Sequence, residues 1–219
     1  MIRSRGEVRR RRGVEDATRR LLQYLVVPIW AGAGFVDWMC HRRTNIETTA
    51  GTEESAIHAL MMAEAGVPAL LGLFFEVNAG VLGATIAAWG LHEVTAVWDV
   101  AYADGRRRVT PTEQHVHGLL EQVPTMATAF LVALHWDQAR ALLGLGDESP
   151  DLKLEPKRRP LSRRYRRGLL ASLTGLVVAP YGEELWRCIR AARDSQGDKQ
   201  ESLERSRATS RNEPTEAIR

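Results

Sequence analysis

Long apolar stretches alternate with short charged segments along most of the chain. A membrane-crossing helix needs about 20 mostly apolar residues, and residues 56–102 form an apolar run that is too long for a single crossing. The triplet Asn-Ala-Gly at 78–80 is typical of a tight turn and divides that run into two helices. The pattern therefore predicts four transmembrane helices, over about 21–38, 56–76, 79–101 and 114–143.

A fifth apolar stretch, at 168–186, is short for a crossing, and Pro180 interrupts it. We expect a helix that lies at the membrane interface or is partly inserted, with a fifth crossing as the alternative. The expected fold is therefore all-α. It is an integral membrane four-helix bundle, with this stretch as a short or interfacial fifth helix.

Charge is concentrated outside the predicted helices. The 219-residue chain has a mean hydropathy of −0.25 and 26% charged residues, values that alone would suit a soluble protein. Arginine dominates the N-terminal arm, however, and the C-terminal tail is polar without apolar periodicity, so that we expect it to be disordered. The expected organisation is a basic cytoplasmic arm, a transmembrane domain, a basic cytoplasmic segment, an interfacial or fifth helix and a disordered tail, over 1–20, 21–144, 145–167, 168–192 and 193–219.

The basic segments also predict orientation and partners. Eight Lys and Arg residues precede Leu21 and eight more lie at 153–167, against five in the loops expected at the other face. Because loops rich in Lys and Arg stay in the cytoplasm, we predict a multi-pass protein of the cell (inner) membrane with both termini cytoplasmic. The arginines adjoin apolar helices and lack interleaved aromatic residues, so membrane lipids are expected as partners and nucleic acid is not.

Four predicted helix ends that meet at one membrane face carry histidine and carboxylate at helical spacing. Residues four or seven apart lie on one side of a helix, and bundle cores build di-iron and di-manganese sites from such side chains. Imidazole and carboxylate together suit iron, manganese or zinc. We therefore predict a metal site formed by Asp37, His41, Glu54, His58, His92, Asp99, Glu113 and His117.

Each pair also has an ordinary explanation. One such pair can be an interfacial salt bridge, and Glu113, which follows Thr110 and Pro111, can sit in the first turn of its helix. The arginines at 42, 43 and 106–108 can neutralise the acids in a salt-bridge network without a metal. Metal binding is favoured because five of the six histidines fall at this one face, and buried charged clusters need a counter-ion.

No motif identifies catalytic residues or a substrate, so the sequence leaves open whether the protein is an enzyme. The leading hypothesis is a di-iron-like oxidoreductase acting on a lipid or other hydrophobic small molecule, whose anionic head group Arg42 and Arg43 would hold. One alternative is a zinc-dependent membrane hydrolase. The other is a non-enzymatic membrane scaffold or transport accessory whose polar cluster is salt-bridged.

Two charged strings carry a resemblance to known proteins. HRRTNIETTAGTEESAIH at 41–58 and RRRVTPTEQHVH at 106–117 resemble an uncharacterised proteobacterial family of small multi-pass integral membrane proteins, over about residues 20–144. The resemblance implies a multi-pass membrane protein. Members sometimes carry an automatic diguanylate cyclase label, but this chain has no GGDEF-like stretch, so the resemblance implies no cyclase activity and no known function.

Overall fold

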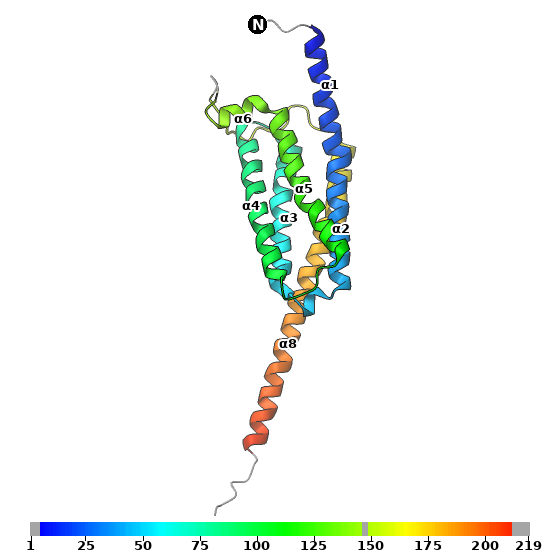
Figure 1. Ribbon diagram of the computed structural model, residues 1–219, viewed down its shortest axis with the longest axis vertical. Coiled ribbons are helices and arrows are strands. Elements are labelled where there is room, and N and C mark those ends of the chain that lie inside the picture. The colour runs from blue at the N-terminus through cyan, green and yellow to red at the C-terminus, as the bar shows by residue number, and fades with distance from the viewer. Residues whose placement is uncertain (1–4, 146–148, 212–219) are drawn as a thin grey trace, which may run out of the picture.

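The computed structural model describes the backbone of residues 5–145 and 149–211. Within these ranges the regular structure is helical, and the one strand-like pairing is an isolated bridge between Phe75 and Pro156. Five helical rods stand side by side in an elongated bundle (Figure 1). The all-α prediction is confirmed.

The first rod joins α1 (Arg5–Leu21), the π-helical turn η1 (Leu22–Val26) and α2 (Val27–Arg43). The N–H of Val27 donates to the carbonyl of Leu22, five residues back. This wide turn directly precedes Pro28, whose ring has no N–H and clashes with the carbonyl four residues back in a regular helix. The chain therefore passes the proline without ending the helix, and the rod extends beyond the predicted range at both ends.

The next two rods are α3 (Gly51–Phe74) and α4 (Ala79–Ala103), and the 3₁₀ turn η2 (Ile46–Thr48) lies before α3. The side-chain oxygen of Asn78 accepts a hydrogen bond of 3.1 Å from the N–H of Val81 and caps α4. The apolar run is divided into two helices as predicted, but the break lies at 75–78, and Ala79 and Gly80 already belong to α4. The helix before it begins earlier than expected, at Gly51.

The fourth rod is α5 (Pro111–Leu134), which begins with a capping box between Thr110 and Glu113. The chain leaves helical geometry at His135, and the short α6 (Trp136–Leu142) turns across the end of the bundle against α4. One continuous helix over 114–143 was therefore a wrong prediction. The break lets α6 bury its two alanines, Ala139 and Ala141, on the bundle end.

The fifth rod joins α7 (Arg163–Leu173), the π-helical turn η3 (Thr174–Val178) and α8 (Ala179–Arg211). As in the first rod, the π-helical turn precedes a proline, here Pro180. The rod packs along α2 and α3, so residues 168–186 form part of a fifth helical rod of the bundle. Its apolar core can be short because one side of the rod packs against protein.

Beyond the bundle, α8 stays helical to Arg211, whereas the sequence predicts disorder from 193 on. This part is rich in Glu, Lys, Arg and Gln, which favour helix without any apolar face, and Glu201 pairs with Arg205 one turn later at 2.5 Å. The expectation is corrected for 193–211, and 212–219 lie outside the described residues. In Figure 1 the start of α1 and the end of α8 project from opposite ends of the bundle.

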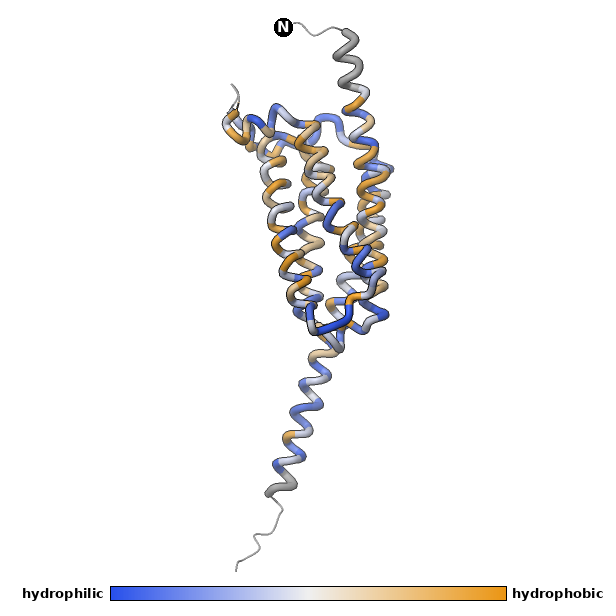
Figure 2. The backbone as a smooth tube through the Cα atoms, viewed as in Figure 1, coloured by the Kyte–Doolittle hydropathy of each residue, from blue (hydrophilic) through white to orange (hydrophobic). Residues whose placement is uncertain are grey.

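The bundle is polar inside and apolar outside. Its interior contains charged side chains that are less than a tenth exposed, while large apolar side chains of α3 and α4 are 40–73% exposed, including Leu60, Val67, Leu70, Leu91, Val94, Val97 and Trp98. Figure 2 shows the hydrophobic colouring along the bundle and hydrophilic colouring on the projecting part of α8. An apolar exterior around buried ionisable groups is typical of proteins in lipid.

Three helical segments within the described residues are long and apolar enough to cross a membrane: Gly13–Arg43, Gly51–Phe74 and Ala79–Ala103. These correspond to the first three predicted crossings. The fourth, α5, has Glu113, His117 and Glu121 in its first three turns. Those side chains lower its hydropathy although the helix is long enough.

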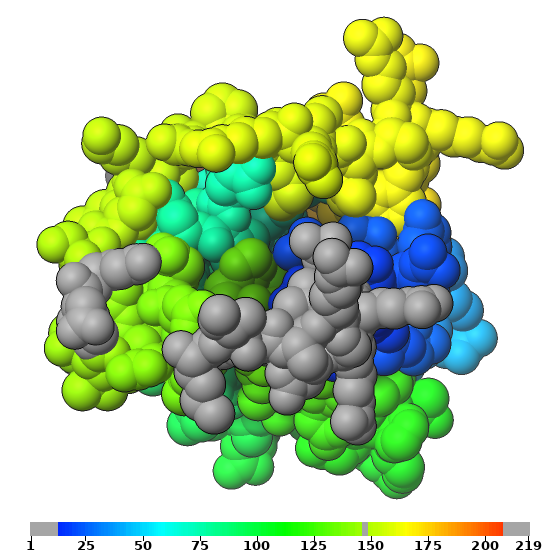
Figure 3. Space-filling model, turned by 90° about the horizontal axis from the view of Figure 1, so that it is seen from above, coloured from blue at the N-terminus to red at the C-terminus, as the bar shows by residue number. Residues whose placement is uncertain are grey.

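An extended segment, 149–162, connects α6 to the fifth rod across the ends of α3 and α4 (Figure 3). Backbone hydrogen bonds hold it in place: Gly80 N–H donates to Asp151 at 3.0 Å, and Glu76 N–H donates to Glu155 at 2.9 Å. A Cβ atom at Gly80 would lie 2.8 Å from the carbonyl oxygen of Leu152. The absence of a side chain at Gly80 permits this close contact.

We expect Gly80→Ala to destabilise the folded protein by about 1–3 kcal/mol, because the backbone of residue 152 must move away. Thermal unfolding in detergent measures the effect. Gly90→Ala is the matched control on the same helix, since a Cβ there meets nothing within 4 Å. Equal unfolding midpoints for the two variants would contradict the close packing of the segment.

Candidate metal centre

Ten ionisable side chains gather at the end of the bundle away from the N-terminal arm. They come from the end of α2, the start of α3, the end of α4, the following loop, the start of α5 and the start of α8. We call this group the polar cluster; it consists of Asp37, His41, Glu54, His58, Asp99, Arg107, Glu113, His117, Tyr181 and Glu184.

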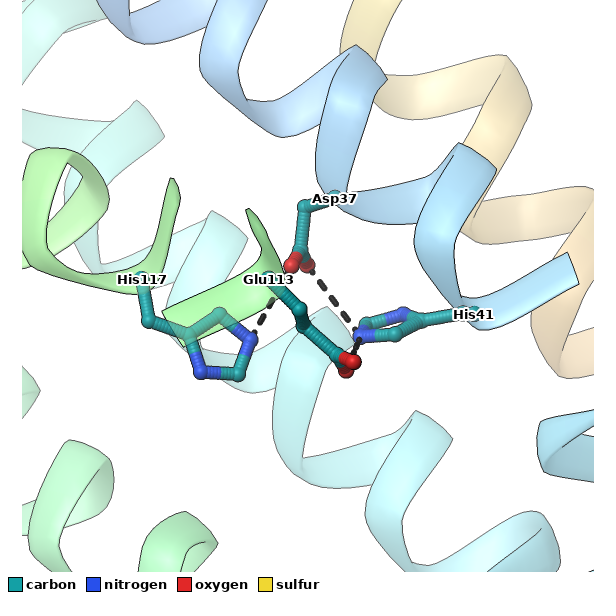
Figure 4. A group of neighbouring side chains, drawn as sticks. All are labelled: Asp37, His41, Glu113 and His117. Atoms are coloured by element: carbon teal, nitrogen blue, oxygen red, sulfur yellow. Dashed lines mark ion pairs between the residues drawn. The ribbon is translucent and has the colours of Figure 1, made fainter. Parts of the chain in front are cut away.

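The first half of the cluster contains Asp37, His41, Glu113 and His117 (Figure 4). The Nε2 atom of His41 lies 3.4 Å from an oxygen of Asp37 and 3.3 Å from Glu113. The Nε2 atom of His117 lies 3.0 Å from the other oxygen of Asp37. One ligand atom from each of the four residues falls within 4.8 Å of all the others.

The second half has the same chemistry on other helices. Glu54 and His58 are one turn apart on α3, and Asp99 reaches them from α4. The Nε2 atom of His58 lies 3.2 Å from Asp99 and 3.7 Å from Glu54. Each half therefore places an imidazole Nε2 between one aspartate and one glutamate.

Glu184 connects the two halves through the opposite ring nitrogens. Its two oxygens lie 2.8 Å from Nδ1 of His41 and 3.2 Å from Nδ1 of His58. A carboxylate only accepts hydrogen bonds, so each Nδ1 carries the hydrogen and donates it to Glu184. The same carboxylate fixes both ring orientations, and the two rings stack with centroids 4.5 Å apart and planes 12° apart.

Arg107 connects the two halves a second time. Its side chain, 1% exposed, donates to Glu54 from Nε at 2.7 Å and to Glu113 from a terminal nitrogen. Burial opposes the charge of the guanidinium, but the hydrogen bond and charge of Glu54, followed by those of Glu113, raise the pKa of Arg107 above its ordinary value. Arg107 therefore stays charged and neutralises one of the buried carboxylates.

The charges of the cluster do not balance. Five buried carboxylates face one guanidinium, so neutral histidines leave an excess of four negative charges. Protonating both stacked rings would reduce the excess, but it would place two cations face to face at 4.5 Å. Several buried ligand atoms form no hydrogen bond in the described part of the chain: Asp37 Oδ1, His41 Nε2, Glu54 Oε2, His58 Nε2 and Asp99 Oδ1.

Seven of the eight predicted metal ligands belong to this cluster, and His92 does not. It lies seven residues before Asp99, on the same face of α4 but about 10 Å further along the helix axis. Its neighbour there is Glu64, with His92 Nδ1 3.6 Å from a carboxylate oxygen. Helical spacing places His92 on the correct face of α4 but does not give its position along the bundle axis. The prediction that His92 belongs to the cluster is therefore corrected: it lies in a separate polar pair with Glu64.

The arginines predicted to hold a head group lie on the exposed end of α2. Arg42 pairs with Glu183 at 3.4 Å and stacks over the ring of Trp38, and Arg43 is exposed. The residues that the sequence reasoning missed are Glu184 and Tyr181, whose hydroxyl donates to Asp37 at 2.8 Å. Two adjacent glutamates at 183–184 in an otherwise apolar stretch were the available signal.

A small cavity of about 20 Å³ borders both halves of the cluster. Asp37, His58, Asp99 and His117 are among its polar lining residues, and Met61, Met62 and Leu120 are among its apolar ones. A space of this size holds about one water molecule. A molecule of that size could therefore contact both halves at once.

No family model, curated protein or solved structure matches the chain. The resemblance to a proteobacterial membrane family stays a prediction. Function must be inferred from the geometry of the cluster.

We expect Arg107→Met to destabilise the protein by about 3–5 kcal/mol, because it leaves Glu54 and Glu113 buried without their cation. Arg108→Met is the matched control, since its side chain is exposed one residue away. Thermal unfolding of both variants in the same detergent, in buffer treated with chelator, provides the comparison. A stable Arg107→Met variant would contradict the charge balance described here.

Proposed function

We propose that the chain is an integral membrane protein that binds two divalent metal ions, one in each half of the polar cluster. The orphaned ligand atoms beside the Glu184 bridge carry this proposal. Two divalent cations would balance the excess of four negative charges. The predicted orientation assumed four crossings; with a fifth rod along the bundle, we propose that the N-terminal arm is cytoplasmic and that the end of α8 lies on the other side.

The donor atoms suit a metal in type and spacing. Imidazole nitrogen and carboxylate oxygen bind zinc, iron and manganese, with bonds of about 2.0–2.2 Å for zinc. Two ligands of one such ion stand about 3–3.4 Å apart in ordinary tetrahedral or octahedral geometry. The nitrogen-to-oxygen distances of 3.0–3.4 Å around His41 and His117 fall in that range.

Glu184 has the role of a residue that orients metal ligands. A histidine that binds a metal donates its other N–H to a carboxylate or carbonyl, which fixes the tautomer and the ring direction. Here one carboxylate does this for both His41 and His58, so that both Nε2 lone pairs face carboxylate oxygens. Such atoms repel unless a proton or a metal cation lies between them. Protons on both rings would place two cations face to face at 4.5 Å, so the stacking favours metal ions.

We further propose that the protein is a metal-dependent oxidoreductase that acts on a hydrophobic substrate. A pair of redox-active ions would supply oxidation chemistry, as in other carboxylate-histidine bundle sites. The small cavity would admit a reactant of about the size of water beside both halves. Asp37, held by the Tyr181 hydroxyl, borders this cavity and would keep its position during proton transfer.

We expect the protein, purified in detergent and loaded with Fe²⁺, Mn²⁺ or Zn²⁺, to retain about two ions per chain, one per half-site. His41→Ala combined with His58→Ala should remove both ions, because each substitution takes one Nε2 ligand. His115→Ala, on the exposed side of α5, is the control and should retain both ions. Mass spectrometry of metal content measures the result, and less than one ion per chain in the parent would refute the proposal.

Glu184→Gln should lower the affinity for both ions by about 10–100-fold, since the amide orients the two rings less well than a carboxylate. Glu183→Gln is the neighbouring control on α8, because Glu183 contacts Trp38 and Arg42 and neither histidine. Titration of metal-free protein with Zn²⁺ measures both affinities. Equal affinities in the two variants would show that Glu184 does not orient the metal ligands.

A further inference from the structure

A second, larger cavity of about 300 Å³ lies inside the bundle on the side of the N-terminal arm. Its walls come from α1, η1, α2, α3, α4, α5, α7 and the segment 149–162, and most of the lining residues are apolar. Its volume is at the lower end of the range for cavities that bind small molecules. The space fits one extended chain and is too small for a two-chain lipid.

The open end of this cavity is basic. Three cations, Arg19, Lys157 and Arg159, and one carboxylate, Glu76, contribute to its lining, and both arginines are exposed. Lys157 Nζ donates to the carbonyls of Gly72 at 2.5 Å and Phe75 at 3.0 Å, which fixes the ammonium group beside the end of α3. Figure 3 shows this face of the molecule hollowed between α1 and the adjoining ends of α3 and α4.

The inner part of the cavity has a polar pair that makes little use of its hydrogen-bonding capacity. Glu64 and His92 both line the cavity, with exposures of 7% and 1%. Thr95 donates to one oxygen of Glu64 at 2.9 Å, but the other oxygen and both nitrogens of His92 have no hydrogen-bond partner within the described chain. Unsatisfied buried groups of this kind are costly and point to a ligand with a polar substituent.

The cavity ends close to the polar cluster. His92 lies two helical turns from Asp99, and Trp30 lies two turns from Asp37, so that each polar layer is about 10 Å from the other. Trp30, Ala65 and Val123 line the large cavity, whereas Met62 and Leu120 line the small one. All five belong to one apolar cluster that separates the two spaces.

We propose that the large cavity binds a single-chain amphiphile with an anionic head group, of the chemical class of a long-chain fatty acid. The head group pairs with Arg19, Arg159 and Lys157, the apolar chain fills the cavity, and His92 with Glu64 receives a polar substituent on the chain. The assignment of this ligand as substrate rests on the proposed function. Its binding does not, because no residue of the polar cluster lines the cavity.

This places the head group at the opposite end of the bundle from Arg42 and Arg43. Those two arginines follow Asp37 and His41 of the polar cluster on α2, whereas Arg19 precedes these two residues by about five to six turns of the same rod. Charge complementarity decides the occupant. An amine or a neutral alcohol gains nothing from three cations at the mouth, while a carboxylate or phosphate forms charge-assisted hydrogen bonds with them.

The test uses the full chain in phosphatidylcholine nanodiscs and a hexadecanoate that carries a photoreactive diazirine near its tail. After irradiation, we expect saturable labelling of residues at the inner end of the cavity, such as Ala65 and Val123, displaced by hexadecanoate and much less by hexadecanol. Arg19→Gln combined with Arg159→Gln should weaken this labelling at least about tenfold. Arg163→Gln combined with Arg164→Gln removes two exposed cations nearby that do not line the cavity and should change nothing.

Ala127→Phe provides a second test from inside the cavity, because its ring would occupy the space while the mouth keeps its charges. It should abolish the saturable labelling. Labelling confined to outward-facing residues such as Val94 and Val97, or equal displacement by acid and alcohol, would overturn the proposal. Labelling that persists in chelator-treated protein supports the cavity assignment even if metal binding fails, so the two proposals are separable.

Discussion

The carboxylate of Glu184 holds together the two histidines on which the polar cluster depends. It accepts hydrogen bonds from Nδ1 of His41 on α2 and from Nδ1 of His58 on α3. Glu184 itself lies on α8, more than a hundred residues further along the chain. The fifth rod therefore does more than cover the bundle. It fixes the tautomer and direction of both rings, which in turn aims two Nε2 atoms at two matching pairs of carboxylates.

The need to compensate the buried carboxylates also determines which other charged groups lie inside the bundle. Five carboxylates can remain buried only where cations and hydrogen-bond donors compensate them. Arg107 and Tyr181 contact three of them directly. The outer surface of α3 and α4, in contrast, is apolar. Fold and proposed function are thus coupled, because the helices that expose apolar side chains hold the candidate metal ligands on their other faces.

Sequence reasoning predicted the features that depend on local spacing. The four-residue pairs Asp37–His41, Glu54–His58 and Glu113–His117 were visible because helical periodicity places both members on one side. The position of a residue along the bundle axis was harder to predict, since His92 and Asp99 share a face of α4 but contact different groups, Glu64 and His58. The contribution of Glu184 could not be derived, because its apolar stretch, 168–186, is shorter than a membrane crossing needs and so was not placed in the bundle. The stretch packs against α2 and α3.

The bundle contains two cavities, a small one beside the polar cluster and a larger apolar one with a basic mouth. The central claim is that each half of the polar cluster holds a metal ion. Anomalous diffraction from crystals grown with Mn²⁺ or Zn²⁺, recorded at the absorption edge of the metal, tests it most directly. We expect two peaks in the anomalous difference map, one between Asp37, His41 and Glu113 and the other between Glu54, His58 and Asp99. A map without peaks at these positions, from protein whose stacked histidines and Glu184 bridge are intact, would contradict it.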